Sequence, residues 1–215
     1  MHIIDRFPEG VGWIADPKET MERASHAIKG DHGVWLIDPV DAYGLDELLA
    51  AEGNVAGVVI TLNRHRRDSE ALAGRYGVSI YLPEQLGALA DDIRYGVRGV
   101  DEFGRDTGWT VDPVIDRRGW HEVMLVAPDR ETVRISEAVG TAPHFCAPGE
   151  KLGVHPLLRL FPPRGVLGDI VADRILVGHG EGVLSDGASL LADTLEHARR
   201  RAPKAYARAL WTFLP

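Results

Sequence analysis

The sequence predicts an α/β sandwich, because strands occur as hairpins in both halves of the chain and helices follow the central strands. The first hairpin joins Ala24–Ile28 to Val34–Ile37 through a turn with two glycines. The second joins Glu122–Ala127 to Thr132–Ile135 through a Pro-Asp-Arg-Glu turn. A regular alternation of strand, helix and parallel strand is missing, so a doubly wound sheet is not expected.

The remaining elements follow from apolar runs and from the residues that end them. Asp68 is placed to cap a helix that closes at Gly77, and Asp186 to cap a later helix that Pro203 is expected to end. The polar, glycine-rich stretch from Asp91 to Arg118 gives no helix signal. The other expected elements are a helix at Leu45–Ala51 and strands at Val55–Leu62, Val78–Leu82 and Arg174–Val177.

Composition narrows the class of protein. The chain has 215 residues, is 45% hydrophobic and carries a net charge of -8, which is typical of one domain spanning residues 1–215 and argues against nucleic-acid binding through a basic face. No apolar run is long enough to span a bilayer, and no secretory signal begins the sequence. The single cysteine, Cys146, has no partner for an internal disulfide. We expect a soluble, cytoplasmic protein with no membrane partner.

The loop after the strand Val55–Leu62 carries the most chemistry. It holds Arg64, His65, Arg66 and Asp68 within a few residues of the strand end. Many α/β proteins place their functional groups at the carboxyl ends of strands. The loop therefore holds either a metal ion, an anion or neither.

Four segments in order resemble the metallo-β-lactamase superfamily. Val34–Asp38 is similar to its early strand ending in aspartate, and Val58–Ser69 to its His-x-His-x-Asp-His strand and loop. Glu122–Glu137 is similar to its later hairpin, which ends in a metal-bridging aspartate, and Val177–Gly180 to its late Gly-His-Gly segment. The resemblance implies a four-layer αββα sandwich with a metal site between the two sheets.

The ligand positions depart from this family pattern. In the register anchored on Asp68, Arg64 and Arg66 stand at the two spaced histidines, Ser69 at the last histidine, and Arg118 near the central one. His65 then falls out of phase. Glu137 replaces the bridging aspartate and His179 remains, so the resemblance implies Asp68 and His179 as catalytic residues. The candidate metal ligands are Asp68, Glu137, His179 and His65.

Three interpretations stay open. Since arginine cannot donate a lone pair to a metal, the leading one is a degenerate site without cofactor, in which Arg64, Arg66 and Arg118 bind an anionic small molecule. The alternative is a hydrolase of esters, thioesters, lactams or phosphodiesters with one zinc, iron or manganese ion; Asn63 and His65 then stand in for the spaced histidines. The third is a metal-free structural or oligomerising module. The apolar segments 157–161 and 211–214 are interpreted as core or as contacts of a homo-oligomer.

Overall fold

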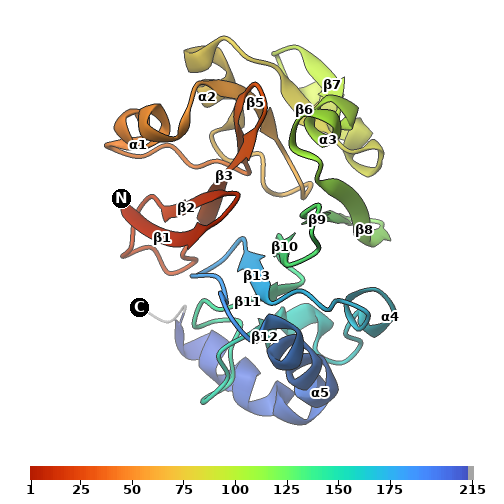
Figure 1. The fold of residues 1–215 in the computed structure, drawn as a ribbon. Helices are drawn as coiled ribbons and strands as arrows, with labels where there is room; N and C mark the ends of the chain where they lie inside the picture. The colour runs from red at the N-terminus through yellow and green to blue at the C-terminus, as the bar shows by residue number, and fades with distance from the viewer. Residues whose placement is uncertain (213–215) are drawn as a thin grey trace.

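The computed structural model describes residues 1–212 and contains two β-sheets packed face to face between outer helices (Figure 1). The larger sheet has the order β1 to β7, and the smaller sheet has the order β13-β10-β9-β8. The strands of the larger sheet are β1 (His2–Phe7), β2 (Gly10–Ile14), β3 (Ala24–Gly30), β4 (Gly33–Ile37), β5 (Val55–Val59), β6 (Ile80–Leu82) and β7 (Val97–Gly99). Those of the smaller sheet are β8 (Thr110–Arg117), β9 (Trp120–Val126), β10 (Thr132–Ile135) and β13 (Arg174–Val177).

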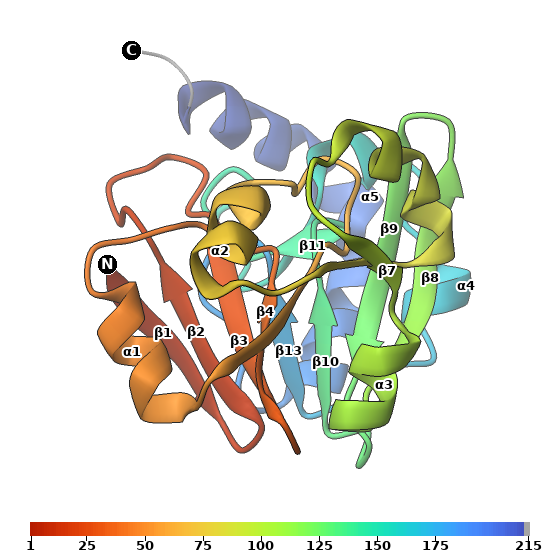
Figure 2. The same cartoon turned by 90° about the horizontal axis from the view of Figure 1, so that it is seen from above.

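A short pair of strands and the helices complete the chain. The pair consists of β11 (Val139–Gly140) and β12 (Gly153–Val154). The helices are α1 (Leu45–Glu52), α2 (Ser69–Tyr76), α3 (Asp101–Thr107), α4 (Arg164–Leu167) and α5 (Gly187–Thr212), with 3₁₀ turns η1 (Glu84–Asp92) and η2 (Pro156–Leu158). Seen from the side of α1 and α2, α5 lies behind the strands (Figure 2).

Strand direction brings several loops together at one edge. Strands β1 to β4 pair antiparallel, whereas β4 to β7 pair parallel. In the smaller sheet β8, β9 and β10 are antiparallel and β10 pairs parallel with β13. The carboxyl ends of β4 and β5 therefore lie side by side, as do those of β10 and β13.

Alternation along the strands separates three apolar layers. Trp35 and Ile37 of β4 face Leu125 of β9 between the sheets, together with Phe103 from α3. Their neighbours Val34 and Leu36 pack outward with residues of α1 and α2. On the far side, Met124, Val126, Ile135 and Val177 pack with Leu191, Leu195 and Ala198 of α5. These layers give the four-layer αββα sandwich that the sequence predicts.

The two predicted hairpins are confirmed as β3–β4 and β9–β10. Two expectations are wrong. The stretch from Asp91 to Arg118 contains α3, because Phe103 is fully buried between the sheets and anchors a helix with little intrinsic signal. Pro203 lies inside α5, which continues to Thr212 because Ala202 and Ala205 stay buried on either side of it.

Among residues 1–212, no helix is both long and apolar enough to cross a membrane.

Truncating a side chain between the sheets tests this layered packing. We expect Leu125→Ala, whose leucine is fully buried, to lower the free energy of unfolding by about 2–5 kcal/mol because it leaves a cavity. The matched Leu157→Ala removes an exposed leucine and is expected to change it by less than about 0.5 kcal/mol. Urea unfolding followed by circular dichroism measures both; equal losses would contradict the packing described.

Candidate metal centre

Four loops that follow strands meet at one edge of the sandwich. Asp38 follows β4, His65 lies in the loop after β5, Glu137 follows β10, and His179 follows β13. The close approach of the last loop requires glycine, because a Cβ on Gly178 would lie 2.2 Å from the carbonyl oxygen of Ser136. The tight Gly-His-Gly geometry expected from the sequence is therefore confirmed.

His65, Glu137 and His179 form a cluster whose ligand-type atoms all lie within 4.8 Å of one another. The two Nε2 atoms are 3.2 Å apart, and Oε1 of Glu137 lies 4.0 Å from Nε2 of His179. The three residues are only 4%, 7% and 2% exposed. Two imidazoles and a carboxylate thus converge in a site that is closed to bulk water.

Hydrogen bonds on the far side of each ring fix the tautomers of both histidines. His179 Nδ1 lies 2.8 Å from the carbonyl oxygen of Met21, which can only accept, so Nδ1 carries the proton. His65 Nδ1 lies 3.0 Å from Oδ2 of Asp38 and donates to that carboxylate. Both Nε2 atoms therefore present lone pairs to each other at 3.2 Å. Only a shared proton or a cation relieves the repulsion between them.

The histidines are held neutral, the form that a metal requires. Burial and the nearby Arg67 guanidinium together lower the pKa of His65 to about 3, against the opposing effect of Asp38. Burial also lowers the pKa of His179 well below its usual value, because a charged ring would face the ring of His65 and the Arg67 guanidinium. Both shifts disfavour a proton on either Nε2 atom at pH 7.

The donor set fits one divalent ion. With zinc–nitrogen bonds of about 2.0–2.1 Å and a tetrahedral angle, two ligand nitrogens lie about 3.4 Å apart. The observed 3.2 Å between the Nε2 atoms is close to this spacing. Neutral imidazoles and a carboxylate are ligands that zinc, iron and manganese all accept.

Asp38 supports the cluster from behind. Its carboxylate is fully buried and accepts hydrogen bonds from the backbone and hydroxyl of Thr61, 2.8 and 2.6 Å long, and from His65. Arg134, also fully buried on β10, pairs with it at 2.7 Å. Burial opposes ionisation, but the Arg134 charge and the His65 hydrogen bond hold the pKa of Asp38 below its usual range. A carboxylate that orients a metal-binding histidine in this way is common in metal sites.

Arg67 ties three loops together beside the cluster. Its guanidinium donates to the carbonyl oxygens of Ala24 and Asp38, at 2.6 and 2.8 Å, and to that of Gly178 at 2.8 Å. Burial lowers the pKa of Arg67 to about 10, so the side chain stays charged at pH 7. The arginine holds the ends of β4 and β13 in place and adds positive charge next to the histidines.

Arg64 covers the outer side of the cluster. It forms an ion pair with Oε2 of Glu137, donates to the Gly119 carbonyl at 3.0 Å, and lies with its guanidinium 4.3 Å from the centre of the Trp120 ring. Because Arg64 takes Oε2, the other oxygen of Glu137 remains directed toward His179. Burial raises the pKa of Glu137, and Arg64 opposes that effect.

Asp68 lies outside the cluster, in contrast to the expectation that it is a ligand and catalytic residue. Its Oδ2 accepts the backbone N–H of Asp41 at 2.8 Å. The same bond removes its side chain from helix capping: Asp68 occupies the N-cap position of α2 but makes no side-chain cap. His65, which the register anchored on Asp68 left out of phase, is the residue of this loop that lies in the cluster.

The three arginines proposed as an anion pocket do not converge. Arg66 pairs with Glu70 and with the carbonyl of Asp92, away from the cluster. Arg118 is exposed in the turn between β8 and β9, and within residues 1–212 no hydrogen bond or ion pair of its side chain is present. Of the three, Arg64 contacts the cluster, and the structure does not bring Arg66 to it.

The structure adds His155 and Glu122, which sequence patterns did not single out. Nδ1 of His155 accepts the Leu157 N–H at 3.2 Å, so its Nε2 carries the proton and faces Oε1 of Glu137 at 3.9 Å. Glu122 is fully buried and accepts the backbone N–H groups of Glu137 and Ala138 at 2.7 and 2.9 Å. No sequence pattern indicates His155, because it reaches the site from a loop after β12. Glu122 could have been found, because a glutamate on the buried face of a predicted strand indicates a buried polar role.

No family model matches the sequence, and no curated protein matches it significantly. Solved structures do match. The metallo-β-lactamase FIM-1 from Pseudomonas aeruginosa in its mono-zinc form superposes with a TM-score of 0.60 at 9% identity, over 93% of this chain and 95% of that one. The chain has the metallo-β-lactamase fold. A metallo-β-lactamase from Pontibacter korlensis gives 0.59 at 16% identity (92% and 98% covered), and the flavodiiron protein from Giardia intestinalis gives 0.62 at 13% (93% and 60% covered).

The cluster draws one imidazole from the loop after β5 and one from the loop after β13. Of Asn63 and His65, the alternative pair expected for the spaced histidines, His65 lies in the cluster. Asn63 does not reach the cluster; its side chain bonds the backbone of Gly119 and His121 across the β8–β9 hairpin. Within residues 1–212 three candidate ligands converge, which fits one ion and not two.

Neutralising Asp38 tests its role as the support of this centre. We expect Asp38→Asn to lower the free energy of unfolding by about 3–5 kcal/mol at pH 7, because it leaves the buried Arg134 charge unpaired. The folded pKa of Asp38 is depressed, so its contribution is present above about pH 4 and is lost as pH falls further. Unfolding curves between pH 7 and 3 measure both effects. If the variant has the same free energy of unfolding as the parent at pH 7, and loses it in the same way as pH falls, this role is ruled out.

Proposed function

We propose that this chain binds one divalent metal ion through His65, Glu137 and His179 and uses it to hydrolyse an anionic substrate. The observation that carries the proposal is the 3.2 Å approach of two unprotonated Nε2 atoms whose Nδ1 atoms are both tied to acceptors. A neighbouring structure of the same fold, FIM-1, is described in a mono-zinc form, which supports a single ion in this architecture.

Each surrounding residue has a definite task. Asp38 and the Met21 carbonyl orient the two imidazoles. Arg64 holds one oxygen of Glu137 and keeps a positive charge at the solvent side of the centre, where its side chain is 39% exposed. An ion bound here would lower the pKa of a water molecule and polarise a carbonyl or phosphoryl oxygen.

His155 supplies a hydrogen-bond donor on the same side as Arg64. Its Nε2–H lies 3.9 Å from Oε1 of Glu137, and the Leu157 N–H at Nδ1 keeps it in the tautomer that donates. This tautomer excludes His155 as a fourth ligand. A substrate oxygen next to Glu137 would accept from His155 while its negative charge faces Arg64, which favours anionic esters, thioesters, lactams or phosphodiesters.

A metal-free site that binds an anionic small molecule is the second candidate. The ion pair between Arg64 and Glu137 favours it, because Arg64 already neutralises the carboxylate that a metal would need. In this case a proton shared by His65 and His179 relieves the contact between their lone pairs.

Metal analysis separates the two candidates. Protein purified without chelator is expected to hold close to one equivalent of zinc, iron or manganese. His65→Ala and His179→Ala are expected to lower zinc affinity by more than about 100-fold in calorimetric titrations, since each removes one of three ligands. Asp68→Ala is the matched control and is expected to bind as the parent does, because Asp68 lies outside the cluster.

The outcomes are distinct. Metal-free parent protein that does not take up zinc would overturn the metal proposal and leave the anion-binding candidate. Loss of binding in Asp68→Ala as large as in His179→Ala would show that the ligand set is wrong. For hydrolysis, a panel of chromogenic anionic esters and phosphodiesters is expected to be turned over by the parent and by Asp68→Ala, but not by His179→Ala.

A further inference from the structure

Helix α5 carries a local concentration of positive charge, although the chain as a whole is acidic. The net charge of the protein is -8, yet residues 199–208 of α5 contain five cations and no carboxylate. Arg201 pairs with Asp193 and Glu150. Among residues 1–212 no carboxylate pairs with the other four, which are Arg199, Arg200, Lys204 and Arg208.

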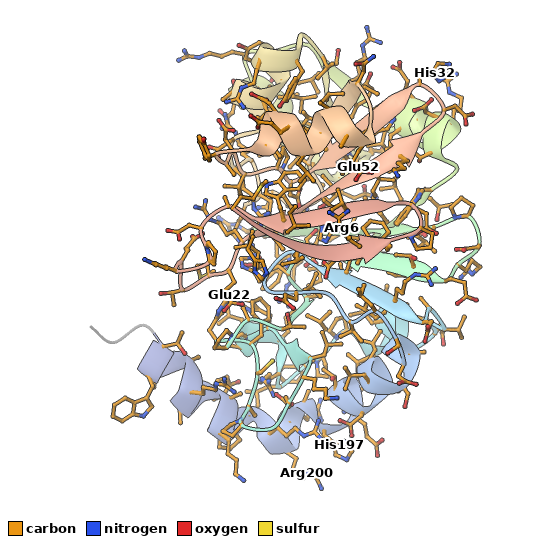
Figure 3. All side chains as sticks on the ribbon, turned by 60° about the vertical axis from the view of Figure 1, so that its left-hand side comes forward. Arg6, Glu22, His32, Glu52, His197 and Arg200 are labelled. Atoms are coloured by element: carbon orange, nitrogen blue, oxygen red, sulfur yellow. The ribbon has the colours of Figure 1, made fainter. Side chains whose placement is uncertain are left out.

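The cations and an aromatic residue share the outward face of the helix. The inward face is marked by buried Leu191, Leu195 and Ala198. At 100° per residue, Arg200, Lys204 and Trp211 lie within about 40° of one another around the helix axis, on the opposite side. All three are exposed. Figure 3 shows Arg200 on the outside of α5, close to His197.

A hollow lies beside this row of side chains. It has a volume of about 450 Å³ and is lined by Arg200, Arg201 and Lys204 on one side and by the segment 147–150 on the other. Three cations around one concave surface are a suitable site for a phosphate group. Glu150, the acidic residue of the lining, is already paired with Arg159 and Arg201.

Exposed apolar side chains border the basic row at both ends. Leu210 and Trp211 are 69% and 76% exposed in the last turn, which extends beyond the sheets at the edge of the molecule (Figure 2). At the other end Phe161 is 76% exposed, and the Arg199 guanidinium lies 5.4 Å from the centre of its ring. These segments were expected to be core or oligomer contacts. Leu158 lies in the core, whereas Leu157, Phe161 and Trp211 are exposed, and Phe213 and Leu214 lie outside the described residues.

We propose that this face of α5 docks on a bilayer surface rich in anionic phospholipid. The hollow takes the phosphate of a headgroup, the unpaired cations neutralise neighbouring headgroups, and Trp211, Leu210 and Phe161 enter the interfacial region. The combination of cations with an exposed tryptophan is the chemistry of interfacial helices, whereas a polyanion such as RNA would leave the apolar side chains uncovered. This surface departs from the expectation of no membrane partner, which considered only spanning segments.

Vesicle flotation of the full-length protein tests the proposal. We expect binding to vesicles of phosphatidylcholine with phosphatidylglycerol and none to phosphatidylcholine alone, with binding lost as salt is raised. The double variant Arg200→Glu, Lys204→Glu is expected to lower the partition coefficient at least about thirtyfold, since each cation near such a surface contributes about fivefold. Trp211→Ala is expected to weaken binding without removing its salt dependence.

The matched control reverses two exposed cations elsewhere. Arg94→Glu, Arg130→Glu changes the net charge by the same amount, after η1 and in the turn between β9 and β10, and is expected to bind as the parent does. Equal loss in both double variants would mean that only net charge matters and would overturn the docking face. So would a parent that binds neither vesicle, or one that binds both equally.

Two further measurements exclude other occupants of this face. Inorganic phosphate or RNA that binds the parent while anionic vesicles do not would overturn the lipid proposal. A parent that sediments as a dimer, becomes monomeric as Trp211→Ala and ignores vesicles would show that a second copy covers the face. None of these outcomes depends on metal binding, so the experiments test the docking face and the metal centre independently.

Discussion

The buried carboxylate of Asp38 is the interaction on which the centre depends. It joins β4 of the larger sheet, Thr61 after β5, and Arg134 on β10 of the smaller sheet, all with no exposure to solvent. An unpaired charge at this depth would cost several kcal/mol. The two sheets must therefore approach in the one arrangement that pairs Asp38 with Arg134, and this arrangement presents His65 to His179.

The arginines of the motif loop act mainly on structure. Arg67 donates to three backbone carbonyls, which belong to β3, to the residue after β4 and to the residue after β13. Arg66 pairs with Glu70 one turn along α2. The loop after β5 is therefore held in place by hydrogen-bonded guanidinium groups beside the cluster of His65, Glu137 and His179.

Sequence patterns predicted the fold better than the ligand set. The hairpins and the order of strands follow from alternation and turn residues, which are local signals. Which residues of the loop after β5 point into the cluster depends on how that loop folds. The sequence could not show that the carboxylate of Asp68 accepts the distant backbone N–H of Asp41 and so lies outside the cluster. His155 and Met21 reach the centre from loops far away in sequence, and only the packed fold brings such groups together.

The charges around the centre also bear on what it would bind. Asp38 and Glu137 supply two carboxylates, while Arg64, Arg67 and Arg134 supply three guanidinium groups, and the imidazoles are neutral. Among these five groups the guanidinium groups exceed the carboxylates by one, and the fully buried Glu122 behind Glu137 adds a third carboxyl group, whose pKa burial raises. A divalent cation would add two positive charges in a site that is closed to bulk water, where electrostatic interactions are strong. Under the proposed function, this added charge would favour an anionic substrate over a neutral or cationic one.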